Sequence, residues 1–200
     1  MIDKTLDRLQ QLLSSKVPTS MISEKTRPAS VLVIIYQKDG GYCIQLQKRS
    51  KLVQNHKGEI SFPGGTPENH DSTSLATALR ETYEEVGILS KDISILGQMD
   101  DVLTQTGYLL KVFVGTITYP YKFLPSKSEV EEILEVPIGE LENPLNWREE
   151  VRLIGQDLIK SYSYAYKSHL IYGATAKIIT QFLQLIEQTS PHKEALCNSP

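Results

Sequence analysis

The chain has 200 residues, a length that suits one well-buried α/β domain and not two. Its 40% hydrophobic and 22% charged residues are typical of a soluble globular protein, and a net charge of -3 gives no basic footprint for nucleic acid. No apolar run reaches membrane-spanning length and the N-terminus lacks the order of a signal peptide, so we expect no membrane partner and a cytoplasmic location. Such a compartment keeps Cys43 and Cys197 reduced.

An amphipathic helix is predicted over residues 2–15, where apolar residues recur on one stripe: Ile2, Leu6, Leu9 and Leu13. The helix ends before Pro18, because the residue before a proline avoids the helical conformation. We expect residues 1–20 to be a helix appended to a domain over 21–188. The stripe suits either a homodimer interface or a cap on the core of its own chain.

A β-hairpin is predicted next. Val31–Tyr36 is a continuous apolar run rich in β-branched residues, and a turn at 38–41 returns the chain into Tyr42–Lys48. The polar segment from Arg49 to Gly65 is predicted to be a long loop, and loops of this length in compact domains are commonly functional.

The rest of the chain predicts one more long helix and several strands. The helix following the loop has Asp71 or Ser72 as its expected N-cap and ends at Gly87. Strands are expected at 93–96, 109–118, 151–154, 162–166 and 169–172, and residues 129–136 form a short amphipathic segment that Pro137 breaks.

A final helix is predicted over 174–187, with its apolar face formed by Ile178, Ile179, Phe182, Leu183 and Ile186. Tyr162, Tyr164 and Tyr166 alternate as one face of a strand, which favours packing in the core or at a dimer interface. The tail 189–200 is expected to be disordered. Helices flanking a mixed sheet follow from this order of elements, which makes the fold class α/β.

The segment Ala78–Ile88 carries the strongest chemical signal. Glu81, Glu84 and Glu85 fall within five residues and, at about 100° per residue, share a helical sector of roughly 100°. Four apolar side chains are expected on the opposite face: Leu75, Leu79, Tyr83 and Val86. Like charges this close repel, and a divalent cation with oxygen ligands would neutralise them.

A solvated acidic face is the simpler alternative for these carboxylates. Three neighbouring features favour the cation site: the rigid loop Phe62–Gly65 before the helix, the stop at Gly87, and Arg80. Arg80 lies four residues before Glu84, within reach of an intrahelical ion pair that would fix the rotamer of that carboxylate. A solvated face needs none of these features.

At these residues the chain resembles the Nudix hydrolases. Their motif R-E-U-x-E-E-x-G-U, in which U is a bulky aliphatic residue, is matched by Arg80, Glu81, Glu84, Glu85, Gly87 and Ile88. Thr82 departs from the first U position, although its γ-methyl can still face the core. The full motif begins with a glycine, and Gly65 lies one residue too far upstream of Arg80 for the standard spacing. Asp71 fills the acidic position between Gly65 and Arg80.

That extra residue is typical of the coenzyme A diphosphatase branch, whose second motif lies upstream. The motif reads R-S-x₃-R-x₃-G-x₃-F-P-G-G, and here its anchors are Arg49-Ser50, Gly58 and Phe62–Gly65. Gln54 replaces the second arginine, which leaves an amide where the branch has a charge. The resemblance covers roughly residues 28 to 186 and implies the Nudix fold, an α/β/α sandwich with a mixed central sheet.

The resemblance also implies a set of catalytic and metal-binding residues. Glu81, Glu84 and Glu85 would hold Mg²⁺ or Mn²⁺, with Glu81 and Glu85 as the leading ligands. Gly64 and Gly65 would let the backbone approach the metal or phosphate. Arg80 would orient a carboxylate. The general base is expected either among Glu81, Glu84 and Glu85, called the box glutamates from here on, or in a more distant group of carboxylates. That group is Glu129, Glu131, Glu132 and Glu135, and the position of the base in the family favours Glu132.

The implied substrate is a small CoA-like nucleotide, and its phosphates call for cationic partners. The loop offers Arg49, Lys51, His56 and Lys57, of which Arg49 can fork onto a phosphate, and Gln54 can still donate a hydrogen bond. One alternative keeps the chemistry with another substrate, such as ADP-ribose, NADH or a dinucleoside polyphosphate. Another is a non-catalytic module that senses a nucleotide.

Overall fold

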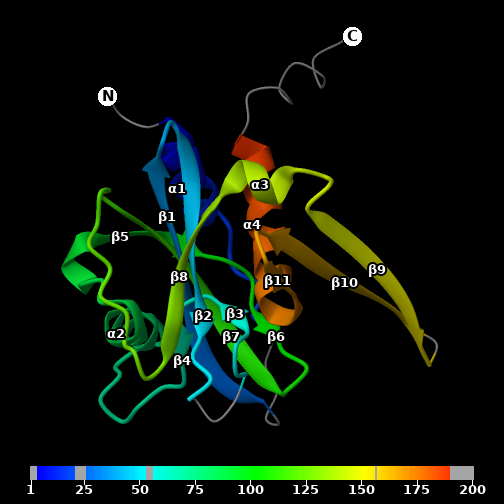
Figure 1. The fold of residues 1–200 in the computed structure, drawn as a ribbon, viewed down its shortest axis with the longest axis horizontal. Helices are drawn as coiled ribbons and strands as arrows, with labels where there is room; N and C mark the ends of the chain where they lie inside the picture. The colour runs from blue at the N-terminus through cyan, green and yellow to red at the C-terminus, as the bar shows by residue number, and fades with distance from the viewer. Residues whose placement is uncertain (1–3, 21–25, 53–55, 156, 190–200) are drawn as a thin grey trace.

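The computed structural model describes residues 4–20, 26–52, 56–155 and 157–189 (Figure 1). Its centre is an eight-stranded mixed sheet. β1 (Arg27–Lys38) pairs antiparallel with β2 (Gly41–Arg49) and parallel with β7 (Tyr108–Ile117), and β5 (Ile93–Gln98) pairs antiparallel with β7 at one edge. β8 (Val130–Pro137) pairs antiparallel with β2. The predicted hairpin is confirmed, and both its strands are longer than predicted.

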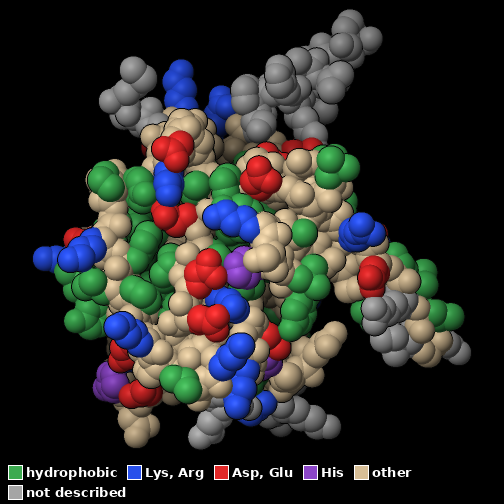
Figure 2. Space-filling model, in the orientation of Figure 1, with side chains coloured by type: hydrophobic (Ala, Val, Ile, Leu, Met, Phe, Trp, Pro, Cys, Tyr) green, Lys and Arg blue, Asp and Glu red, His purple; other side chains and the backbone are tan. Residues whose placement is uncertain are grey.

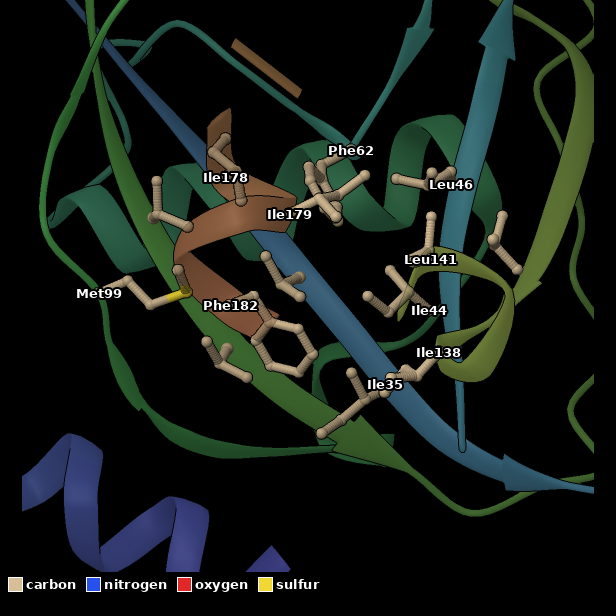
Figure 3. Packing of buried hydrophobic residues seen from close by; sticks show 14 of the residues in the cluster. Ile35, Ile44, Leu46, Phe62, Met99, Ile138, Leu141, Ile178, Ile179 and Phe182 are labelled. Atoms are coloured by element: carbon tan, nitrogen blue, oxygen red, sulfur yellow. The ribbon is translucent and has the colours of Figure 1, made fainter. Parts of the chain in front are cut away.

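Helices cover both faces of this sheet, because β1 is apolar on both sides. Leu32, Ile34 and Tyr36 pack with α2 (Ser74–Val86) in one buried cluster. Val33 and Ile35 alternate with them and pack in a second cluster with α1 (Lys4–Ser15) and α4 (Gly173–Thr189). Figure 3 shows Ile178, Ile179 and Phe182 of α4 in the same buried cluster as Ile35 and Ile44. The predicted α/β/α sandwich with a mixed sheet is confirmed.

Three short strands complete the sheet: β3 (Ile60–Ser61), β4 (Gly64–Gly65) and β6 (Val102–Leu103). Two of them lie within the segment predicted as a continuous loop. β3 pairs with β2, and β4 pairs with β1 through Ser30↔Gly65 and Val31↔Gly64. The long segment is therefore fastened to the sheet near its C-terminal end.

A second, three-stranded sheet is formed by β9 (Trp147–Ile154), β10 (Asp157–Tyr166) and β11 (His169–Ile171). The predicted tyrosine face packs inside the chain: Tyr164 is buried, with its hydroxyl 2.8 Å from Oγ1 of Thr180, and Tyr166 donates to the carbonyl oxygen of Glu135. The far ends of β9 and β10 extend from the body as an arm (Figure 1). Apolar side chains gather on this arm in Figure 2. Leu153 of β9 and Leu158 of β10 are exposed.

The short helix α3 (Ile138–Glu142) joins β8 to β9, and the 3₁₀ turn η1 (Ser90–Asp92) joins α2 to β5. α1 packs Leu9 and Leu13 into the core of its own chain, so its stripe caps that core. α4 extends through the buried Thr189, whose carbonyl accepts a hydrogen bond from Arg8. Helix α4 thus includes the first residue predicted as tail. Leu183 and Ile186 of its predicted apolar face pack half-buried against the core, and Leu185, which was not predicted there, is buried as well.

Ile2 and residues 190–200, which include Cys197, lie outside the described residues. Cys43 is buried as a free thiol. None of the helices in the described part of the chain is long and apolar enough to span a lipid bilayer. On the face in Figure 2, acidic and basic side chains are interspersed.

Candidate active site

A cleft of about 950 Å³ is formed by β1, β3, β4, β7, α2, the start of α4 and the loops between them. Of the residues predicted for the site, those on its wall are Arg49, His56, Gly64, Gly65, Glu81 and Glu85. Four other predicted residues are described but do not line it: Lys57, Arg80, Glu84 and Glu132. Gln54 lies outside the described residues.

Helix α2 supplies the carboxylates of this wall. Thr73 is its N-cap, with the hydroxyl accepting a hydrogen bond from the amide of Ala76 at 3.0 Å, so the predicted N-cap at Asp71 or Ser72 is wrong. Gly87 ends the helix as predicted, at φ 75° and with its amide donating to the carbonyl oxygen of Tyr83.

The three helix glutamates do not share one exposed face. Ala78, Thr82 and Glu85 follow the i, i+4, i+7 spacing of the buried stripe, so Glu85 is only 2% exposed. Glu84 lies at the outer edge of the sector with a half-exposed side chain, and Tyr83, predicted in the core, is 55% exposed. Thr82 is buried, in line with its predicted orientation.

Glu85 is held by three partners. Its Oε2 accepts hydrogen bonds from Nε2 of Gln47 at 2.8 Å and from the amide of Gly64 at 2.9 Å, and Nη1 of Arg49 lies 3.3 Å from its Oε1. Burial nevertheless raises the pKa of Glu85 to about 7, with a smaller contribution from the nearby Glu81 charge. The site therefore contains a carboxylate whose negative charge the protein only partly compensates.

Arg80 connects the helix to the loop in front of it. Its Nη1 lies 2.8 Å from Glu84 and 3.0 Å from Glu81, and its Nη2 donates to the carbonyl oxygen of Thr66 and to Oδ2 of Asp71, both at 3.0 Å. The predicted Arg80–Glu84 contact is confirmed. Since Arg80 does not line the cleft, its geometry suits the orientation of carboxylates.

Gly64 and Gly65 bring the backbone close to these carboxylates. Gly64 has φ 152°, and a Cβ there would collide with the backbone of Ser30 and Val31. A Cβ on Gly65 would collide with the carboxylate of Glu81. The two glycines thus allow strand β4 to lie between β1 and α2.

The donor set suits a divalent cation. Among the described residues, no group of three acidic, histidine or cysteine side chains is arranged to hold a metal ion by itself. Arg80 lies 3.0 Å from Glu81, and Arg49 lies 3.3 Å from Glu85. Burial raises the pKa of Glu81, and the charges of Glu84 and Glu129 raise it further. Repulsion among hard carboxylate oxygens on one cleft wall is what Mg²⁺ or Mn²⁺ would relieve, so Glu81 and Glu85 fit the ion best.

The loop after β2 is closed at its neck by backbone hydrogen bonds. The amide of Arg49 donates to Glu59 at 2.9 Å, and the amide of Gly58 donates back to Arg49 at 3.1 Å. His56 lines the cleft with its Nδ1 2.9 Å from Glu59. Among the described residues, Nε of Arg49 is buried without a hydrogen-bond partner, which leaves it available to a ligand.

The geometry favours Glu129 over Glu132 as a base. Glu132 is turned to Nε2 of His169, at 3.3 Å, and does not line the cleft, whereas Glu129 does. The Ser50 amide holds the Glu129 backbone at 2.7 Å. The β2–β8 register shifts between Lys48 and Arg49, which pair with Glu132 and Val130, and the sequence carries no signal for this shift.

Other residues of the wall were missed entirely. They come from segments far apart in the sequence, and include Arg27, Thr104, Thr106, Tyr108, Tyr172 and Thr175. Only the parallel pairing of β1 with β7 and the position of α4 bring them together, so no local pattern could have identified them.

A mixed sheet between helices, with the carboxylates of one helix facing a cleft beside a Gly-Gly strand, defines a Nudix hydrolase. A profile of the NUDIX domain matches residues 26–158, and the chain belongs to this family. It is a diphosphatase enzyme, so the alternative of a non-catalytic sensing module is not retained.

Curated relatives cover most of the chain. The Nudix hydrolase NudL of Photorhabdus laumondii is 34% identical over 171 residues, spanning 85% of this chain and 90% of that protein. The peroxisomal coenzyme A diphosphatase NUDT7 of Mus musculus is 27% identical over 192 residues, spanning 92% and 81%. A solved Ap4A hydrolase of C. elegans shares the fold with a TM-score of 0.50 at 19% identity, covering 56% of this chain and 82% of its own.

Proposed function

We propose that this Nudix hydrolase cleaves the diphosphate of coenzyme A or acyl-CoA, giving 3′,5′-ADP and 4′-phosphopantetheine or its acyl form. The observation that carries the proposal is that Arg49 and Gly64 both contact the carboxylate of Glu85. Both residues are anchors of the upstream motif that resembles the CoA branch, and the mouse relative is named a coenzyme A diphosphatase.

The cleft provides separate groups for charge neutralisation and for binding. A divalent cation held by Glu81 and Glu85, with Glu84 as a more distant candidate, would neutralise phosphate charge and lower the pKa of water at the site. Arg49 can donate from its unpartnered Nε to a diphosphate oxygen while Nη1 stays beside Glu85. Gly64 and Gly65 line the cleft, so their backbone can approach the phosphate, while the space beside each Cα is filled by β1 or by Glu81.

Glu129 is the proposed general base. Its carboxylate lies on the cleft wall and would accept the proton of the attacking water. The water oxygen then forms the new P–O bond as the bond from that phosphorus to the bridging oxygen breaks, and the departing phosphate keeps the electron pair. Arg80 would act indirectly, by holding Glu81 and Glu84 in place.

His56 is retained as a substrate contact, because it lines the cleft. Lys57 would act only by its charge near the loop. Three points remain predictions. They are a homodimer, a cytoplasmic location, and the division of the chain into an appended helix 1–20, a domain 21–188 and a tail. The dimer would need a surface other than the buried stripe of α1.

A substrate panel tests the proposal against its alternatives. We expect kcat/KM with Mg²⁺ or Mn²⁺ to be higher for CoA or an acyl-CoA than for ADP-ribose, NADH and a dinucleoside polyphosphate. A preference for any of the latter would assign this Nudix site to another nucleoside diphosphate derivative.

A further inference from the structure

The cleft extends beyond the carboxylates along the floor of the sheet. Arg27, Ala29 and Val31 are alternate residues of β1 that line it, and Tyr108 and Leu110 are alternate residues of β7. The parallel register places Arg27 opposite Tyr108 and Ala29 opposite Leu110. The floor therefore runs from an acidic end, across an apolar middle, to a cationic end at Arg27.

The Arg27 guanidinium has few partners of its own. Its carbon lies 4.0 Å from the centre of the Tyr108 ring, and its Nη2 donates to the carbonyl oxygen of Thr106 at 2.9 Å. No carboxylate within residues 4–20, 26–52, 56–155 and 157–189 forms an ion pair with it. The stacked, tethered side chain keeps its positive charge and most of its N–H donors for a ligand.

Two hydroxyl groups belong to the turn whose Thr106 carbonyl Arg27 contacts. Oγ1 of Thr104 and Oγ1 of Thr106 lie 3.1 Å apart, and both residues line the cleft. The amide of Tyr108 donates to Oγ1 of Thr104 at 2.9 Å, which fixes the turn. One hydroxyl proton serves the pair and the other remains available, so an arginine fork and a hydroxyl donor occur together, as in phosphate-binding sites.

The position of this group suits a second phosphate. Gly65 pairs with Ser30, three residues along β1 from Arg27, which corresponds to about 10 Å of strand. Coenzyme A carries a phosphomonoester on its ribose, separated from the diphosphate by the sugar. Arg49 is already beside Glu85, and Lys57 is not on the cleft wall.

We propose that Arg27, with the hydroxyls of Thr104 and Thr106, binds the 3′-phosphate of the substrate nucleotide. This assignment deepens the proposed function and rests on it. It makes Arg27 the residue that distinguishes a 3′-phosphorylated substrate from one that lacks this group.

The test compares CoA with 3′-dephospho-CoA for the wild-type enzyme and Arg27→Gln. Arg27 is exposed at the first position of its strand, so the substitution preserves the fold. We expect kcat/KM for CoA to fall about 10- to 100-fold, the effect of losing charge-assisted hydrogen bonds, while kcat/KM for dephospho-CoA changes less than threefold. Arg27→Lys should recover part of the loss. Lys91→Gln, which removes an exposed charge on η1 outside the cleft wall, should preserve both values.

The assignment would be overturned if Arg27→Gln lowered kcat/KM equally for CoA and dephospho-CoA. It would also be overturned if the variant kept the wild-type preference for CoA over dephospho-CoA. A binding arm separates this failure from failure of the proposed function. By calorimetry, 3′,5′-ADP should bind the wild-type protein more tightly than 5′-AMP, and Arg27→Gln should abolish the difference. If CoA is not cleaved but this difference is found, the proposed function fails and the 3′-phosphate subsite stands. Equal binding of both nucleotides by the wild-type protein would remove the subsite.

Discussion

The carboxylate of Asp71 and the guanidinium of Arg80 form a tight ion pair, with Oδ2 3.0 Å from Nη2 and the Asp71 side chain 3% exposed. Hydrogen bonds from Arg80 hold the pKa of Asp71 well below its usual range, with help from the amide of Glu68 and the hydroxyl of Thr77. Asp71 stands at the acidic position of the expanded Nudix motif. The extra loop residue is thus accommodated with an anchor for the arginine that orients Glu81 and Glu84.

Asp71→Asn should lower kcat about 10- to 100-fold, because Arg80 loses the charge that fixes its guanidinium. It should also lower Tm at pH 7. The lowered pKa of Asp71 means that this stabilisation is present above the ordinary aspartate pKa and is lost as the pH falls further. Steady-state kinetics and thermal unfolding measure both effects. Asp39→Asn in the β1–β2 turn is the matched control, and an unchanged kcat in Asp71→Asn would contradict the anchoring role.

Glu85→Gln should reduce turnover about 10²- to 10³-fold at saturating Mg²⁺. The amide oxygen can keep the hydrogen bonds from Gln47 and Gly64, so the fold should persist although the side chain is buried. Kinetics with circular dichroism of the purified variant provide the measurement. Glu142→Gln, an exposed change on α3, should retain full activity. Wild-type turnover in Glu85→Gln would remove Glu85 from the metal site.

The raised pKa of Glu85 predicts a pH-dependent stability without metal. From its ordinary value near 4.5 to about 7, the folded state keeps a proton that the unfolded state releases, so the free energy of unfolding falls as pH rises. The loss should approach about 3 kcal/mol by pH 8. Urea unfolding in EDTA at pH 5 and pH 8 measures it, with Glu85→Gln as the reference. Parallel pH profiles of the two proteins would contradict the shift.

Much of the local structure is predictable because its determinants are close in sequence. The β1–β2 hairpin follows from an apolar run and a Gly-Gly turn, and the end of α2 follows from Gly87. The burial of Glu85 is harder to predict from the sequence, because a carboxylate in the buried i, i+4, i+7 stripe of a helix contradicts the usual pattern of apolar residues facing the core. Gln47, Gly64 and Arg49 make that position tolerable, and they come from elsewhere in the fold.

The two adjacent glycines should respond differently to alanine. Gly64→Ala adds a Cβ against the Ser30 and Val31 backbone at a positive φ, so it should destabilise the protein by about 1–3 kcal/mol. Gly65→Ala meets only the flexible carboxylate of Glu81, so it should change stability by less than about 1 kcal/mol and lower kcat by displacing that group. Urea unfolding and kinetics distinguish them. A stable, fully active Gly65→Ala would show that the position of Glu81 does not limit the reaction.

Glu129→Gln should lower kcat about 10²- to 10⁴-fold, as expected for removal of a general base. Glu132→Gln, three residues further along the same chain segment, is its matched control, and it should leave kcat near wild type because Glu132 faces His169. Loss of turnover in Glu132→Gln instead would restore the selection made from family position.

These two glutamates also show where sequence reasoning ends. They are three residues apart in one acidic run, and only the fold places Glu129 on the cleft wall and Glu132 beside His169. Arg27 and Tyr108 are opposite each other only because β1 and β7 pair in parallel across most of the domain. Such non-local pairing leaves no signal in residue spacing or composition. The residues of α2 and of the upstream motif are each contiguous in the sequence, so a local pattern can identify them.

The most direct measurement is chromatographic analysis of the products after incubating the protein with CoA and Mg²⁺ or Mn²⁺, beside an EDTA control. We predict that 3′,5′-ADP and 4′-phosphopantetheine appear in equal amounts with metal and are absent with EDTA. Intact CoA under both conditions would contradict CoA as the substrate, and cleavage that EDTA leaves unchanged would contradict the divalent-cation site at Glu81 and Glu85.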